Sequence, residues 1–398
     1  MSSELSIDAI RVFSAGRDEP KWLLKKRLDG LKQFEKFEAP TFSYGLGINL
    51  NTDTLDLEIA VPKNLWSVAS EITSTADKEI IVKKLSDAVK DEDLKDYLFK
   101  TSPINKIEAL HQAVWSEGLF VKIPEGKEVK TPVNITSDAK AIAIAEHNLF
   151  IAEPGSKMTV VQKSIGKPQF KTANSEIHVQ DSARIQYGEF QNLSEKTNYF
   201  SKKIAYVQKD ATIDWIACDI GARFGGVTLI TNLEGRGSKV SSRSMFFGRG
   251  EQNFDFYLVA NHKAKDTTSY LDVKGALDGK SKAIYRGLVR IEKGAPNSDG
   301  YQNEETLLLS SDAEASAVPN LEIDNNDVKC SHGTAIGQID KSKLFYMMTR
   351  GMDEITAKRK LVEGFFEPFI QKIPVDVVKA DLKKIILERI GGINELKH

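Results

Sequence analysis

The sequence predicts a mostly β protein: a central stack of similar coils, with a mixed helix-rich segment before it and a helical segment after it. Turns of small residues recur at steps of 26, 29 and 27 residues, marked by Gly155, Asp181, Asp210 and Gly237. Short runs of alternating polar and apolar residues separate these turns. On both sides the apolar period changes to that of a helix. A near-constant repeat of units too short to bury a face alone indicates coils that stack.

Residues 1–114 form the first predicted domain. Pro20 follows two acidic residues at a plausible helix start, and Leu24, Leu28 and Leu31 share one face of that helix. Residues 54–61 alternate as a strand does. The Lys- and Asp-rich segment 76–115 is expected to form further helices with solvated charged faces.

The second domain, residues 115–340, carries the repeat. Its strands include residues 158–161, 184–187, 212–215 and 239–245. A parallel β-helix is the most economical arrangement of such units. A β-sandwich is the alternative, because period-2 strands with regular turns also describe it.

The third domain, residues 341–398, has helical period. Asp353 can cap a helix that Pro374 ends, and a last helix is expected over residues 376–390, before Gly391 and Gly392. The apolar stripe of the first helix comprises Ile355, Val362, Phe365, Phe366, Phe369 and Ile370. We expect these helices to cap the end of the coil stack. Since the three phenylalanines exceed what one cap needs, part of the stripe is expected to face a partner.

Composition excludes several classes of function. The chain has 398 residues, of which 41% are apolar and 28% charged, and a net charge of −1, so no basic field points to nucleic acid. No apolar run approaches the ~20 residues that span a bilayer, and the first residues lack the pattern of a signal peptide. We expect a cytoplasmic protein without a membrane partner. The two cysteines, Cys218 and Cys330, exclude a disulfide framework.

Cys330 and His332 are the leading candidates for chemistry. On a strand, residues two apart point to the same face, so a thiol and an imidazole lie side by side. These are ligand types that iron and iron–sulfur clusters take. Two ligands do not close a site, and the remaining ligands are expected from a partner chain. Cys218, flanked by apolar and acidic neighbours, is interpreted as a structural thiol.

Other candidates have simpler interpretations. His262 and His147 lack a neighbouring cysteine or carboxylate pair and are expected to be hydrogen-bonded histidines. The segment 275–281 is one residue short of a phosphate-binding P-loop and precedes no predicted helix, so it predicts a turn and no bound nucleotide. A carbohydrate-acting β-helix, with Glu322, Asp324 and Asp327 as its acids, is the enzymatic alternative. Such enzymes are usually secreted, and the sequence shows no signal peptide.

Several motifs, in order along most of the chain, resemble the SufB/SufD family of scaffold proteins in the SUF iron–sulfur cluster assembly system. They are Glu19-Pro20, Trp22-Leu23, Arg27-Leu28, Phe34-Glu35, His262, Thr267-Thr268-Ser269, Lys274-Gly275, Leu277 to Lys280, Tyr285-Arg286-Gly287 and the stretch 318–333. The resemblance implies a right-handed parallel β-helix. Cys330-Ser331-His332-Gly333 looks like the SufD version, in which the histidine faces SufB at the nascent-cluster site. In SufB a cysteine follows the glutamine of the preceding strand, whereas here Gln302 is followed by Asn303.

The resemblance therefore implies a SufD-like, non-catalytic subunit. It would share a transient nascent iron–sulfur cluster with a SufB-type subunit, or with a second copy of itself, pairing through the edge of the last strands. Its helical tail would bind the ATPase SufC, which supplies nucleotide hydrolysis. The tail residues expected at that interface are Arg350, Gly351, Glu363, Gly364, Phe365, Phe366 and Pro368. The alternative within the family is a SufB-type scaffold that acts as a homodimer and uses Cys330 as its thiolate.

Overall fold

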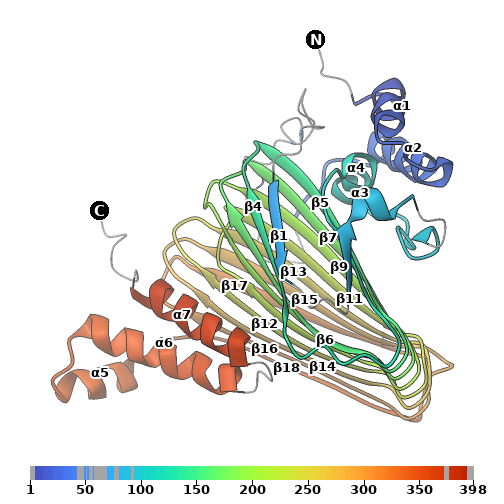
Figure 1. Ribbon diagram of the computed structural model, residues 1–398. Helices are drawn as coiled ribbons and strands as arrows, with labels where there is room; N and C mark the ends of the chain where they lie inside the picture. Colours follow the sequence, from blue (N-terminus) through green and yellow to red (C-terminus); the bar gives the residue numbers. More distant parts are fainter. Residues whose placement is uncertain are drawn as a thin grey trace.

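A computed structural model describes residues 5–42, 49–50, 52, 57, 70–75, 80–90, 94–371 and 376–391. Two long sheets face each other and form a flattened β-helix, with helices packed against its outer faces (Figure 1). From Leu119 onward, consecutive strands alternate between the sheets, so each coil contributes one strand to each sheet.

Within the described residues, each sheet has nine strands. The first contains β1 (Ser70–Thr75), β4 (Val133–Ala139), β6 (Lys157–Gly166), β8 (Arg184–Leu193), β10 (Thr212–Asp219), β12 (Lys239–Gly248), β14 (Thr268–Leu277), β16 (Ser298–Leu308) and β18 (Val328–Gln338). The second contains β2 (Ile81–Lys84), β3 (Leu119–Ile123), β5 (Ala143–Ala152), β7 (Phe170–Val179), β9 (Asn198–Val207), β11 (Phe224–Leu233), β13 (Asn253–His262), β15 (Lys282–Ile291) and β17 (Glu314–Ile323). All neighbours pair in parallel except β1 with β4 and β2 with β3. Parallel pairing confirms the β-helix and excludes the sandwich.

The turns explain the constant repeat. Gly155 and Gly237 have φ of 68° and 73°, and Asp210 has φ of 54°, the left-handed conformation that glycine and aspartate tolerate best. Successive turns are hydrogen-bonded, since the Asp210 N–H donates to the Arg236 carbonyl at 2.9 Å. Because each turn forms backbone hydrogen bonds with the turn of the next coil, the number of residues between successive turns stays nearly constant.

Along the long strands, alternate residues point into the space between the sheets. Phe150, Tyr187 and Trp215 stack edge to face there, with ring centroids 5.4 Å apart at both steps. The other residues of each long strand point outward, and helices cover many of these outward side chains. The covered outer faces explain why strand after strand is buried on both sides, as parallel strands usually are.

Helices α1 (Ile7–Gly16), α2 (Lys21–Lys36), α3 (Leu85–Ala88) and α4 (Lys106–Val114) precede the long strands. With the chain around them they cover the outer face of the second sheet, where Phe170, Phe200 and Phe224 belong to the same apolar cluster as Leu23 and Leu110.

Arg27 of α2 fixes this arrangement of helices. Its guanidinium is fully buried, pairs with Glu19 at 2.7 Å, and donates to the carbonyls of Ala113 and Trp115. Gly30 lets α2 approach α4, since a Cβ at this position would lie 2.9 Å from the Ala113 nitrogen. Two residues of the first quoted motifs, Glu19 and Arg27, therefore have a structural role.

Three expectations for this region need correction or lie outside the described residues. Pro20 precedes α2 as its cap and is not its first helical residue. The segment 76–115 is not helical throughout, because β2 pairs antiparallel with β3. Apart from Leu57, the predicted strand 54–61 lies outside the described residues.

Helices α5 (Lys341–Thr349), α6 (Glu354–Gln371) and α7 (Asp376–Gly391) follow the last strand. Asp353 caps α6 as predicted, accepting from the Thr356 N–H at 2.9 Å. The helices do not cap the end of the β-helix. Val362, Phe366 and Phe369 of α6 instead pack across the outer face of the first sheet, in a cluster with Phe190 and Phe247. Pro374 and Gly392 lie outside the described residues.

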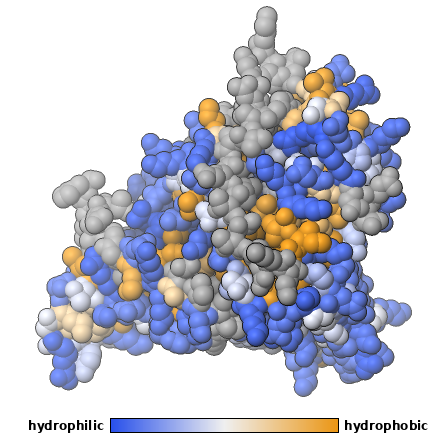
Figure 2. Space-filling view, viewed as in Figure 1, coloured by the Kyte–Doolittle hydropathy of each residue, from blue (hydrophilic) through white to orange (hydrophobic). Residues whose placement is uncertain are grey.

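The visible face of the molecule is mainly hydrophilic, with apolar residues gathered beside the central strands and a smaller apolar area over the C-terminal helices (Figure 2). Within the described part of the chain, no helix combines the length and apolar character that crossing a membrane requires.

Candidate functional site at the open end of the β-helix

Among the described residues, no further strand or helix covers the end of the β-helix that β17 and β18 form. Each of these strands is the final member of its sheet. Most residues of β18 are exposed, and none of them is fully buried. The C-terminal helices lie on a side face, so the edges of β17 and β18 remain open. This end contains both Cys330 and His332.

The register of β18 places both residues on one face of the strand, as the sequence predicts, and shows that this is the inner face. Cys330 lies opposite Gly300 and His332 opposite Gln302 in the ladder with β16. Gly300 and Gln302 are buried, and β16 alternates buried and more exposed residues between Ser298 and Thr306. The thiol and the imidazole therefore continue the inner face beyond the last covered coil.

The Cys330 side chain is half-buried and packs against the core of the β-helix. Gly300 provides its space, since a Cβ there would lie 3.2 Å from the Cys330 sulfur. Burial, and then the carboxylate of Asp299, raise the pKa of the thiol. Cys330 is therefore a neutral thiol at neutral pH unless a metal displaces its proton.

His332 is exposed, and the residue opposite it in the ladder, Gln302, is held by two hydrogen bonds. Beneath it, the Gln302 amide nitrogen donates to the Asn320 carbonyl at 3.0 Å, and the Tyr285 hydroxyl donates to the Gln302 amide oxygen at 3.3 Å. These bonds connect three strands. Among the described residues, no group of three or more His, Cys, Asp or Glu side chains is arranged to hold a metal ion. The described part of the chain therefore places two donors on one face without closing a site around them.

Glu304 was missed by sequence reasoning. It lies on the inner face two residues from Gln302, is 2% exposed, and its Oε2 atom has no hydrogen-bond partner in the described structure. Burial raises its pKa to about 7. The alternation of β16 was the available signal, because Glu304 has the same parity as Gly300 and Gln302. Asn303, at the position of the SufB cysteine in the resemblance, faces the other way and donates to Asp272.

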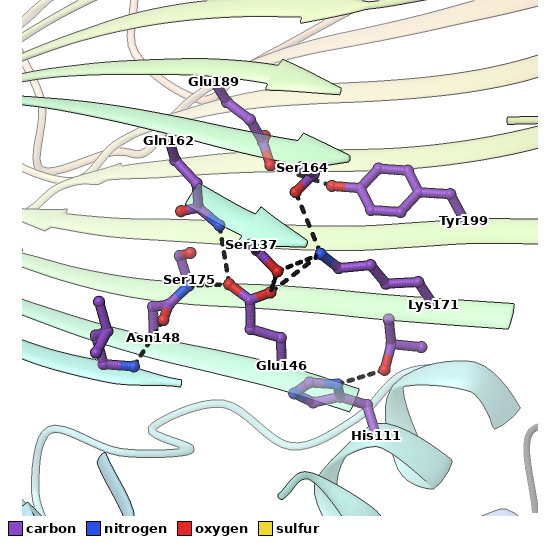
Figure 3. Close-up of polar contacts among 12 residues, drawn as sticks. His111, Ser137, Glu146, Asn148, Gln162, Ser164, Lys171, Ser175, Glu189 and Tyr199 are labelled. Carbon is purple, nitrogen blue, oxygen red and sulfur yellow. Dashed lines mark hydrogen bonds and ion pairs between the residues drawn. The ribbon is translucent and has the colours of Figure 1, made fainter. Parts of the chain in front are cut away.

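A second set of charged residues lies deeper inside the β-helix (Figure 3). Lys171 and Glu146 form a fully buried ion pair at 3.1 Å. Ser137 and Ser164 accept from the Lys171 ammonium, while Asn148 and Gln162 donate to the Glu146 carboxylate. Although burial opposes ionisation, the Lys171 ammonium and the hydrogen bonds that Ser137 and Asn148 donate lower the pKa of Glu146.

This network extends to the following coils. Lys203 pairs with Glu189, to which the Tyr199 hydroxyl donates at 3.1 Å. Asp219 lies nearby, and burial followed by the charge of Glu189 raises its pKa to about 7. Sequence reasoning missed these groups because charged residues that alternate along a strand normally indicate a solvated face.

The predicted partner-binding residues of the tail divide between the interior and the surface. Phe366 is fully buried against Phe247, with ring centroids 6.5 Å apart, and Phe365 is half-buried with the Lys274 ammonium 4.4 Å from its ring. The segment from Glu363 to Pro368 lies within α6.

The other tail residues are more exposed. Glu363 pairs with Lys360 at 2.8 Å, a Cβ added at Gly364 would meet no described atom within 4 Å, and Pro368 is exposed. Arg350 donates to the Tyr346 hydroxyl at 3.1 Å, and Gly351 has φ of 91° where α5 turns into α6.

An exposed apolar patch on α5 and the start of α6 was only partly anticipated. Phe345 is 69% exposed and Tyr346 58% exposed. We call this surface the α5 patch; it comprises Phe345, Tyr346, Met348, Met352 and Ile355. Its area is visible over α5 in Figure 2.

The remaining candidates are structural. Cys218 is buried beneath the C-terminal helices, and burial raises the pKa of its thiol. His262 is buried and hydrogen-bonded to Thr267 and Ser269, as predicted. The near P-loop is the turn between β14 and β15, with Gly279 at φ of 67°. Glu322, one of the three acids, is bound to Arg290 at 2.6 Å.

These features define the class of protein: a β-helix whose last coil presents a thiol and an imidazole on one face, with C-terminal helices that expose an apolar patch. Residues 134–365 match the family model of the SufBD core domain of the SUF system for FeS cluster assembly, which covers more than half of the chain. The chain belongs to this SufBD family.

Curated relatives agree with the family. The chain is 28% identical to the iron-sulfur cluster assembly protein SufD of Bacillus subtilis, over 98% of this chain and 99% of that protein. It is 26% identical to an iron-sulfur cluster assembly SufBD family protein of Staphylococcus saprophyticus, over 98% of this chain and 94% of that protein. The predicted family is confirmed.

Proposed function

We propose that this chain is a SufD-like, non-catalytic subunit of a SUF complex, which pairs with a SufB-type subunit through its open end and binds the ATPase SufC through its C-terminal helices. The observation that carries the proposal is the position of Cys330 and His332 on the uncovered inner face of the last coil. A subunit that completed a cluster site alone would need further donors beside them.

The open end supports pairing with another β-helix. Strand edges with unpaired backbone groups favour addition of a further strand, and natural proteins usually cover such edges. Here the C-terminal helices are available in the chain but pack elsewhere. Pro319, which cannot donate a backbone hydrogen bond, lies in β17, where prolines of sheets are normally found at edges.

The donor set supports a shared cluster as cargo. The imidazole of His332 is exposed, whereas the thiol of Cys330 is half-buried with a raised pKa. His332 can reach a cluster at the interface without moving β18. The partner subunit would supply the thiolates.

The α5 patch supports a protein partner at the tail. Since Phe366 and Phe369 already pack on the first sheet, the SufC contact is assigned to the exposed Phe345, Tyr346, Met348, Arg350 and Gly351, together with the partly exposed Glu363. Large exposed aromatic and methionine side chains rimmed by charges are typical of interaction surfaces.

Anaerobic reconstitution with iron and sulfide tests the proposal. The purified chain alone is expected to gain no visible charge-transfer absorption, whereas the same chain co-purified with a SufB-type subunit and SufC is expected to gain it. If the chain alone forms a dimer that assembles a cluster, the SufB-type homodimeric scaffold replaces the proposed role.

A further inference from the structure

A row of buried titratable groups lies far from the open end, where α4 packs on the second sheet. Nδ1 of His111 is 2.8 Å from the Thr172 hydroxyl oxygen, and its Nε2 is 3.0 Å from Nδ1 of His147. His147 Nε2 has no hydrogen-bond partner in the described structure and lies 4.0 Å from Oε1 of Glu176. Figure 3 shows His111 projecting from its helix toward the sheet.

Two cavities adjoin the two ends of this row. A chamber of about 20 Å³ is lined by both His147 and Glu176. Its volume suits one water molecule, and two of its polar lining atoms, His147 Nε2 and Glu176 Oε2, lack protein partners among the described residues. At the other end, Thr172 and His111 line a larger cavity of about 310 Å³.

We propose that this row is a proton-relay site: one water molecule bound in the small chamber joins Glu176 to His147, and the two imidazoles carry a proton between Glu176 and Thr172 at the wall of the larger cavity. The relay transfers a proton, and water in the larger cavity accepts the proton that the row releases.

The surroundings allow Glu176 to titrate while both rings remain neutral. Burial raises the pKa of Glu176 to about 7, against the Phe99 N–H that donates to its carboxylate. Burial lowers the pKa of His147 to about 3 and that of His111 well below its usual value. The charged and titratable groups that face the row from neighbouring elements are Lys26 and Arg27 of α2, Glu108 of α4, and Lys202 and Tyr206 of β9.

The protons balance along the row. With Glu176 protonated, its O–H donates to the water, the water donates to His147 Nε2, and each ring donates from Nδ1, His147 to His111 and His111 to Thr172. When Glu176 ionises, its proton passes to the water and a water proton to His147 Nε2. The Nδ1 proton of His147 moves to His111 Nε2, that of His111 Nδ1 to the Thr172 oxygen, and the threonine proton leaves to the cavity. One proton is released and both imidazoles change tautomer.

Nitrogen NMR of the ¹⁵N-histidine-labelled full chain tests this inference. As the pH rises through about 7, His111 and His147 are expected to change together from Nδ1–H to Nε2–H, with neither forming an imidazolium ion. His262 is the internal control, since it is equally buried but contacts only hydroxyl groups. Its tautomer should stay constant over the same range.

The Glu176→Gln variant removes the titrating proton and should make both tautomers independent of pH. Constant tautomers in the wild-type protein between about pH 6 and pH 8, or an imidazolium at either ring, would overturn the relay. The wild-type spectrum decides the question even if the variant does not fold. Because the test does not involve cluster assembly, it can fail while the proposed SufD-like role stands.

Discussion

His332 lies directly opposite Gln302 in the parallel ladder between β18 and β16, and the Gln302 amide is bonded to both β15 and β17. An exposed imidazole at the rim of the β-helix thus stands on a side chain that three strands hold in place. Because His332 is exposed, its imidazole is accessible at the open end.

His332→Ala should impair cluster assembly by the complex without disturbing its formation. Loss of a direct ligand should reduce the rate of cluster transfer to an apo-ferredoxin by at least about tenfold, since even outer partners of metal ligands matter that much. Thr334→Ala, on the same face of β18, is the matched control. A wild-type rate for His332→Ala would show that the histidine is structural.

Cys330→Ala should have a smaller effect on assembly than His332→Ala. Its thiol is half-buried and its pKa is raised, so core packing accounts for most of its contacts. The same transfer assay, combined with thermal unfolding, separates the two roles. An equal or larger loss of assembly with unchanged stability would make Cys330 the principal ligand.

Two substitutions in the C-terminal helices should have different effects, one on SufC binding and the other on the stability of the fold. Phe345→Asp should abolish co-purification of SufC and change the free energy of unfolding by no more than about 0.5 kcal/mol, because Phe345 is 69% exposed. Phe366→Ala should instead cost about 3–5 kcal/mol, since it opens a cavity between α6 and the first sheet. Retained SufC binding by Phe345→Asp would exclude the α5 patch as the contact.

The buried ion pair should be intolerant of losing one member. Lys171→Met should lower the free energy of unfolding by about 3–5 kcal/mol, because Glu146 would remain ionisable and buried without its partner. The double variant Lys171→Met/Glu146→Gln should recover a large part of that loss. Urea unfolding measures both. A double variant no more stable than Lys171→Met would mean that the pair is not the cause.

His262 should make stability depend on pH. Burial lowers its folded pKa to about 4, whereas in the unfolded chain it binds a proton below about 6.5. Its contribution is therefore complete above that pH and is lost as the pH falls toward 4. The stability difference between wild type and His262→Asn should shrink by about 1.4 kcal/mol per pH unit in this range. A constant difference would contradict the lowered pKa.

The repeat and the paired ligands could be predicted because both depend on local rules. Turns such as those at Gly155 and Gly237 require small residues, and residues two apart on a strand share a face. The interior charges were not predictable in the same way. Glu146 and Lys171 are 25 residues apart, and only the stacking of β5 beside β7, with β4 across from them, makes one neutralise the other.

By itself the sequence determined the coil repeat, the helical ends and the common face of Cys330 and His332, because each follows from spacing along the chain. The family was indicated separately, by the resemblance of several motifs. The tertiary structure decided which surfaces are covered. It placed α6 over Phe247 on a side face and left β18 open, buried Phe366 while exposing Phe345, and joined His111 to His147 across two elements. The physical reason is that burial depends on what packs against a face, and an apolar helix stripe does not specify which of several apolar faces it will cover.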